Sequence, residues 1–178
     1  MRLSRHVFIS FLGLILLSSC GKDDPGSTTP TTLTTPTTQT DPTIQAALDL
    51  EYEALEKLAA LFPDGETGLK ADLLDKALKG GLSKKNLKTV DAKGFVTYLL
   101  LSDEKLNGKI PEEIKYLEKL QALDLAKNQL TGELPIEAFK KLTKLIYVDI
   151  SENQGITNAD AFKTQLEAAI PNIEVINN

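Results

Sequence analysis

A repeat of 24 residues occupies the second half of the chain and limits the folds that it can adopt. The segment 96–111 returns as 120–135, with its apolar positions and a Gly-x-Ile/Leu-Pro ending in the same places. A third copy follows at an offset of 25 and a fourth begins after it, and their recurring residues are Leu145, Val148, Ile150 and Asn153, then Ile170, Ile173, Val175 and Asn178. One copy of this length cannot enclose its own apolar side chains, so the pattern predicts a solenoid in which neighbouring copies stack.

The spacing Leu-x-x-Leu-x-Leu-x-x-Asn-x-Leu at 120–130 resembles the leucine-rich repeat. The Gly-x-Ile/Leu-Pro ending resembles its plant-type subclass, which also occurs in bacterial surface proteins. The resemblance covers 96–178 and implies an α/β fold: a short leucine-rich-repeat solenoid with parallel strands on the concave face and short helices on the convex face. We expect three full repeats and a terminal strand, with strands at 96–101, 120–125, 145–150 and 170–175.

Several recurring residues have structural roles in these repeats. Pro111 and Pro135 suit the first turn of short convex helices, and the apolar residues expected to face the core behind them are Ile114, Leu117, Phe139 and Leu142. We expect the side-chain amides of Asn128, Asn153 and Asn178 to turn inward and bond the backbone of the turns. Glu104 replaces this Asn in the first copy, and the third copy continues from Ile156 into an amphipathic helix.

Residues 44–95 predict a helical N-terminal cap that ends in a hairpin. Asp41-Pro42 suits the start of a helix, and the expected apolar face of that helix is Ile44, Ala47, Leu48, Leu55, Leu58, Ala59 and Phe62. A second helix is expected at 69–79, before Gly80-Gly81, and a hairpin at 89–96. The layout resembles the cap of bacterial leucine-rich-repeat proteins, although the chain lacks the tryptophans usual there. An independent helical domain is the alternative.

The first 20 residues predict export and a lipid anchor. Arg2 and Arg5 precede an apolar run at 7–17, and small residues follow up to Cys20, which is the layout of a secretory signal peptide. The run is shorter than the roughly 20 apolar residues that a membrane-spanning helix needs. Leu17-Ser18-Ser19-Cys20 resembles the lipobox of bacterial lipoproteins, which implies that 1–19 are cleaved and that Cys20 is lipidated.

Residues 20–43 then consist largely of Thr and Pro, and we expect a disordered tether because this composition cannot bury enough apolar surface to fold. Gly21-Lys22-Asp23-Asp24 resembles a signal that places lipoproteins on the outer face of the outer membrane. We therefore expect a bacterial outer-membrane lipoprotein displayed on the cell surface. A periplasm-facing orientation and glycosylation of the tether stay open.

The residue types that usually carry catalysis are scarce. His6 is the only His and Cys20 the only Cys, and both lie in the part expected to be cleaved or acylated. Nucleophile–base pairs and zinc sites therefore lack their usual members, and acid pairs such as Glu112-Glu113 suit a solvated helix face. The formal net charge of −5 disfavours nucleic acid as a partner. We expect a protein that is not an enzyme and that has no cofactor or metal.

Side chains between the buried strand positions should form rows across the concave face. One expected row is Tyr98, Ala122, Tyr147 and Asn172, and the next is Leu100, Asp124, Asp149 and Glu174. Adjacent acids beside two tyrosines favour a protein, peptide or glycan ligand, above all one that presents Lys or Arg. A merely solvated sheet face is one alternative. Another is a structural envelope lipoprotein that self-associates through the edge of its last strand, 170–175.

Overall fold

The computed structural model of the protein describes residues 41–78 and 80–178. The predicted signal peptide (1–19), Cys20 and nearly all of the predicted tether (20–43) lie outside the described residues. These assignments therefore stay predictions.

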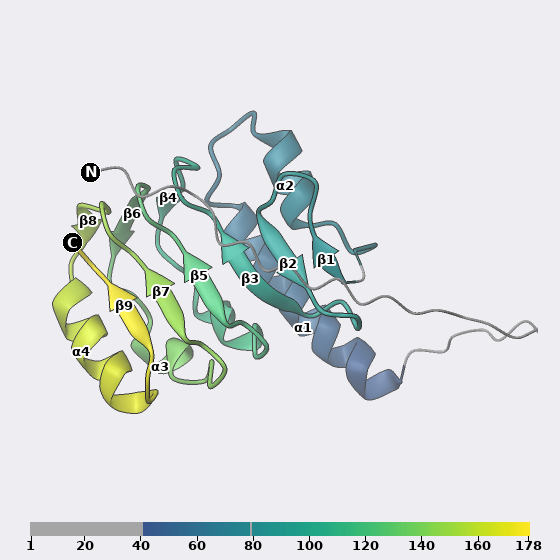
Figure 1. Cartoon of the computed structure of the whole chain (residues 1–178). Helices are drawn as coiled ribbons and strands as arrows, with labels where there is room; N and C mark the ends of the chain where they lie inside the picture. Colours follow the sequence, from purple (N-terminus) through teal and green to yellow (C-terminus); the bar gives the residue numbers. More distant parts are fainter. Residues whose placement is uncertain (1–40, 79) are drawn as a thin grey trace, which may run out of the picture. The chain divides into compact units, whose positions relative to one another are not determined.

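The four repeats contribute one strand each to a six-stranded sheet (Figure 1). These strands pair in parallel in chain order and are β3 (Val96–Leu100), β5 (Ala122–Asp124), β7 (Tyr147–Asp149) and β9 (Glu174–Ile176). The side chains of Leu99, Leu123 and Val148 lie in register on neighbouring strands and are fully buried. Equivalent residues of successive copies thus share one core, which confirms the predicted α/β solenoid.

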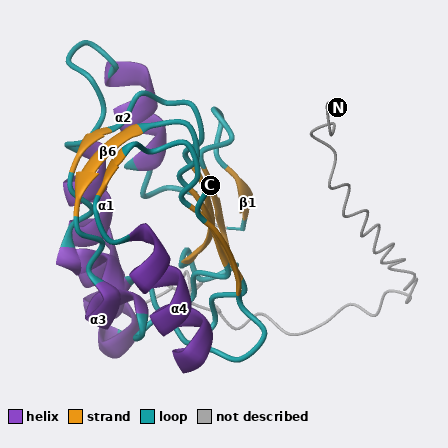
Figure 2. Ribbon diagram, turned by 90° about the vertical axis from the view of Figure 1, so that its left-hand side faces the viewer, coloured by secondary structure: helices purple, strands orange, loops and turns teal. Residues whose placement is uncertain are grey.

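Short helices cover the other side of this core. They are the 3-10 helix η1 (Glu112–Tyr116) and the α-helices α3 (Ile136–Phe139) and α4 (Ala159–Ala169). Figure 2 shows α3 and α4 across from the six-stranded sheet, on the side that carries α1. Pro111 and Pro135 directly precede η1 and α3, and the residues expected to face inward behind them are fully buried: Ile114, Leu117, Phe139 and Leu142.

A second, three-stranded parallel sheet connects the two faces, and the sequence pattern did not predict it. Its strands are β4 (Asn107–Gly108), β6 (Gln129–Gly132) and β8 (Gly155–Ile156). The backbones approach closely here, since a Cβ atom on Gly155 would lie 2.6 Å from the Leu130 carbonyl oxygen. The second sheet joins the first three repeats by a further set of backbone pairings.

Two of the three predicted Asn residues bond the turn backbone from inside. The Asn128 Oδ1 atom accepts the N–H of Leu106 at 2.9 Å, and its Nδ2 atom donates to the Leu101 carbonyl at 2.7 Å. Asn153 repeats this geometry one copy later, accepting the Leu130 N–H at 3.1 Å. The prediction for Asn178 is wrong, because this residue is exposed.

The position of the fourth strand is also a correction. The predicted strand 170–175 assumed a third copy of 25 residues, but α4 occupies 11 residues where α3 occupies four. The longer helix delays the strand, so Tyr147 pairs with Glu174 rather than with Asn172. Asn172 lies in the turn before β9, with a φ of 64°.

The residues before the repeats form the cap. Helix α1 (Pro42–Ala59) begins where the side chain of Asp41 accepts the Thr43 N–H at 2.9 Å, so the last residues assigned to the tether are helical. Helix α2 (Thr67–Leu73) ends six residues before the predicted end. Strands β1 (Gly81–Leu82) and β2 (Lys88–Val90) then extend the sheet as antiparallel neighbours leading to β3.

Candidate binding face

The register of the sheet defines two rows of side chains on its outward face. The first row is Tyr98, Ala122, Tyr147 and Glu174, and the second is Leu100, Asp124, Asp149 and Ile176. Six of the seven residues predicted for this face therefore lie on its strands, and Asn172 does not. Glu174 moves from the second row to the first, where it neighbours Tyr147.

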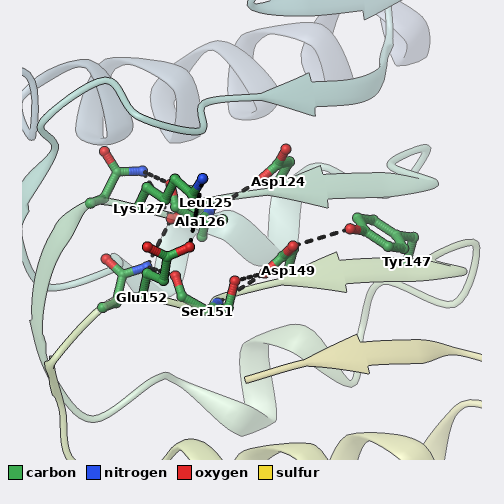
Figure 3. Close-up of polar contacts among 10 residues, drawn as sticks. Asp124, Leu125, Ala126, Lys127, Tyr147, Asp149, Ser151 and Glu152 are labelled. Atoms are coloured by element: carbon green, nitrogen blue, oxygen red, sulfur yellow. Dashed lines mark hydrogen bonds and ion pairs between the residues drawn. The ribbon is translucent and has the colours of Figure 1, made fainter. Parts of the chain in front are cut away.

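Two acids of the second row stand side by side at the ends of their strands (Figure 3). The Asp124 Oδ1 atom accepts the N–H of Ala126 at 3.0 Å. Asp149 repeats this contact with the N–H of Ser151 at 2.9 Å and also accepts the Ser151 hydroxyl at 2.6 Å. Both carboxylates thus stabilise the turn that follows their strand, while their half-buried side chains stay accessible from the sheet face.

The tyrosines of the first row are tied to their surroundings by their hydroxyl groups. The Tyr147 hydroxyl donates to the Asp149 Oδ2 atom at 3.2 Å, and the Tyr98 hydroxyl donates to the Gln121 Oε1 atom at 3.2 Å. Burial, together with the nearby charges of Asp149, Asp124 and Glu174, raises the pKa of Tyr147 to about 12. Tyr147 is therefore a neutral aromatic donor throughout the physiological pH range.

The face combines negative charge with apolar contact area. Asp124 and Asp149 are neighbours on β5 and β7, and Glu174 on β9 lies one row away, next to Tyr147. Leu100, which pairs with Asp124, is 42% exposed. At the rim, Lys127 lies 3.6 Å from Glu152, and both side chains are exposed. A surface of this kind suits a ligand that brings positive charge and an apolar or aromatic group.

The part of the chain that the structure describes contains neither a candidate metal site nor a candidate membrane-spanning helix. No three or more His, Cys, Asp or Glu side chains are grouped so that they could bind a metal ion within 41–78 and 80–178. Over the same residues, no helix has the length and apolar character required to cross a bilayer.

The cap contains a buried polar cluster that the sequence pattern did not predict. Glu51, Asp72 and Lys88 are 3%, 7% and 3% exposed. Glu51 lies seven residues after Ile44, on the apolar face of α1. An acid at a core-facing helix position is the sequence feature that could have indicated this buried cluster.

Comparison with known proteins gives the same picture of the repeats. The Leucine Rich Repeat family matches residues 119–142. A leucine-rich repeat receptor-like serine/threonine-protein kinase of Arabidopsis thaliana, RGI4, is 40% identical over 62 residues, which are 35% of this chain and 5% of that protein. The inactive receptor-like kinase BIR2 of the same plant is 33% identical over 107 residues, which are 57% of this chain and 17% of BIR2. The chain therefore spans only a small part of these relatives.

Solved structures resemble the fold. The Arabidopsis receptor kinase HAESA, in complex with the peptide hormone IDA and the co-receptor SERK1, superposes with a TM-score of 0.52 and 22% identity over 73% of this chain and 22% of HAESA. The PEPR1–AtPEP1 complex gives a TM-score of 0.53 and 24% identity over 71% of this chain and 18% of that one. The described part of the chain is a short leucine-rich-repeat solenoid.

Proposed function

We propose that the protein is an interaction module that binds a protein or peptide with basic side chains through the outward face of its six-stranded sheet. The observation that carries the proposal is the neighbouring pair Asp124 and Asp149, with the exposed Leu100 opposite Asp124 and with Glu174 next to Tyr147 in the adjoining row. The proposal assigns no catalytic step to the domain.

The chemistry of the face supports a cationic ligand. A Lys or Arg side chain placed at Asp124 and Asp149 gains charge-assisted hydrogen bonds, and Glu174 adds negative charge beside Tyr147. The neighbouring tyrosines supply rigid aromatic surface with little conformational entropy to lose. HAESA, whose structure resembles the fold, is in complex with the peptide hormone IDA.

The proposal includes an anchor at the other end of the chain. We propose that Cys20 is lipidated, that 20–43 separates the domain from the membrane, and that the solenoid faces outward from a bacterial outer membrane. The support is the lipobox-like and Thr/Pro-rich sequence alone, and a periplasm-facing orientation is the alternative. Display beyond the headgroups would leave the sheet face open to partners.

The test compares binding of basic and acidic peptides to the full chain and to the variant Asp124→Asn/Asp149→Asn/Glu174→Gln. Asn retains the oxygen that accepts the Ala126 and Ser151 N–H groups, so the turns keep their contacts while the charge is removed. We expect the chain to bind Lys- and Arg-containing peptides of an array, with an affinity that falls as salt is added. The triple variant should lose at least tenfold in affinity.

The matched control removes the same charge outside this face. Glu112, Glu133 and Glu167 are exposed and lie on or next to the convex helices. Their replacement by Gln should leave peptide affinity unchanged. An equal loss of peptide affinity in both triple variants would mean that binding depends only on net charge, which contradicts a specific site on this face. Preference for acidic peptides, or binding to a glycan array instead, would also contradict the proposal.

A second candidate function has one structural observation in its favour. Among the residues that the structure describes, strand β9 pairs with β7 alone, so it forms one edge of the six-stranded sheet. An edge strand can pair with another chain, and a structural envelope protein could self-associate there. Light scattering of the full chain at rising concentration distinguishes the two functions, since a monomer at all concentrations excludes assembly.

A further inference from the structure

A buried carboxyl group joins the cap to the first repeat. The Glu51 Oε1 atom, on α1, accepts the N–H of Val96 at 2.8 Å across 45 residues of sequence. Val96 is the first residue of β3. The Glu51 side chain is 3% exposed, and its Oε2 atom is buried without a hydrogen-bond partner.

The backbone irregularity beside Val96 explains why this contact exists. The register of β2 against β3 shifts between Thr89 and Val90, so that Val90 stands opposite Val96. The Val96 N–H donates to the cap helix instead of to β2, and a buried N–H without an acceptor is costly. Glu51 therefore satisfies a backbone donor at the point where the repeats begin.

Charged groups from every neighbouring part of the cap surround this carboxyl. Lys88 on β2 is almost fully buried, and its Nζ atom donates to the Asp75 carbonyl at 2.9 Å. Asp72 on α2 is buried with an unpartnered Oδ2 atom. Asp91 lies in the hairpin turn. Asp49, Asp75 and Lys76 line a pocket of about 200 Å³ together with Glu51.

We propose that Glu51 is a proton-controlled latch, which holds the cap on the first repeat while its carboxyl group is neutral and loosens the start of β3 when the group ionises. A neutral carboxyl keeps the Val96 hydrogen bond through one oxygen without placing a charge in the core. An ionised one stays buried with a single hydrogen bond, and burying a charge in this way is strongly unfavourable. The inference does not depend on the proposed function.

The direction of the pH effect follows from the pKa. The pKa of Glu51 is raised from 4.5 to about 8, chiefly by burial; the Val96 hydrogen bond and Lys88 act against this rise, and Asp91 adds to it. Between these two values the unfolded chain is ionised and the folded chain is protonated. The stabilisation is therefore complete below pH 4.5 and is lost as the pH rises through about 8.

Lys88 acts in the opposite direction. Burial lowers the pKa of Lys88 from 10.5, so its contribution favours the folded state as the pH rises. The charge of Glu51 raises the pKa of Lys88, so a comparison of wild type with a Glu51 variant measures the titration of Glu51 together with its coupling to Lys88.

The test measures urea-induced unfolding of the full chain and of Glu51→Gln at pH 5, 6, 7 and 8. Gln retains a carbonyl oxygen for the Val96 N–H and cannot ionise. We expect the folding constant of wild type, divided by that of Glu51→Gln, to fall about 10- to 100-fold between pH 5 and pH 7. The exposed Glu53 on the same helix supplies the control, and Glu53→Gln should keep the wild-type pH dependence.

A second measurement does not depend on whether the variant folds. Carbon-13 NMR of the Glu51 carboxyl in wild type should give a titration midpoint near 8, and hydrogen exchange at Val96 should lose protection above that pH. A midpoint near 4.5, or the same pH dependence in wild type and Glu51→Gln, would overturn the latch.

Discussion

Replacing Asn128 by Ala tests the idea that one inward-facing amide per repeat holds the turns together. The Asn128 side chain bonds five backbone groups, and three of these are not left unpaired in the variant. The Leu125 carbonyl still accepts from Asn153, the Ala126 carbonyl still accepts from the Asp103 N–H, and the N–H of the half-buried Glu104 can reach solvent. The Leu106 N–H and the Leu101 carbonyl lose their partner. At about 1–3 kcal/mol for each buried unpaired group, we expect a loss of about 3 kcal/mol in unfolding free energy.

Urea unfolding followed by circular dichroism measures this loss. With a slope of about 1–3 kcal/mol per molar urea, the midpoint of Asn128→Ala should fall by roughly 1–3 M. Asn178→Ala is the control, because it makes the same substitution at an exposed Asn, and its change should stay within about 0.5 kcal/mol. If the two variants unfold at the same urea concentration, the buried amide does not hold the turn.

Two further predictions concern the second sheet and the anchor. Gly155→Ala places a Cβ atom 2.6 Å from the Leu130 carbonyl oxygen and should lower the unfolding free energy by about 1–3 kcal/mol. Gly68→Ala is the control: this residue lies in helix α2 with open space around it, and the change should raise the unfolding free energy by up to about 1 kcal/mol. Equal shifts of the melting temperature in the two variants would contradict the close approach at Gly155. Labelling cells with a radioactive fatty acid should mark the wild-type chain and not Cys20→Ser, and label on both would exclude this residue as the lipidation site.

The repeat predicted most of the fold because stacking translates sequence spacing directly into space. Once Leu99, Leu123 and Val148 occupy one column, the strands, their parallel order and the convex helices follow. The predicted position of the fourth strand was wrong because a repeat spacing predicts positions only while each copy has the same length. The 11 residues of α4 shifted it, and counting helix length after Ile156 would have indicated the change.

The candidate face was predictable as a set of outward positions, but its exact neighbours were not. Asn172 entered the predicted row through the assumed 25-residue offset, and Glu174 was assigned one row away from Tyr147 for the same reason. Glu51 was missed for a different reason. Its partner, the Val96 N–H, becomes available only through an irregular register between β2 and β3, which no residue pattern specifies.

The strand-end acids raise a question that the amide variants can answer. Asp124 and Asp149 each bond a backbone N–H two residues later, so a turn role alone would explain why an acid recurs there. A turn requires only the oxygen, which Asn also supplies, whereas recognition of a cation requires the charge. Unchanged stability with lost peptide binding would therefore assign the carboxylates to a partner. Unchanged binding in the Asn variants would mean that the acids serve the turns and that the face recognises its ligand without them.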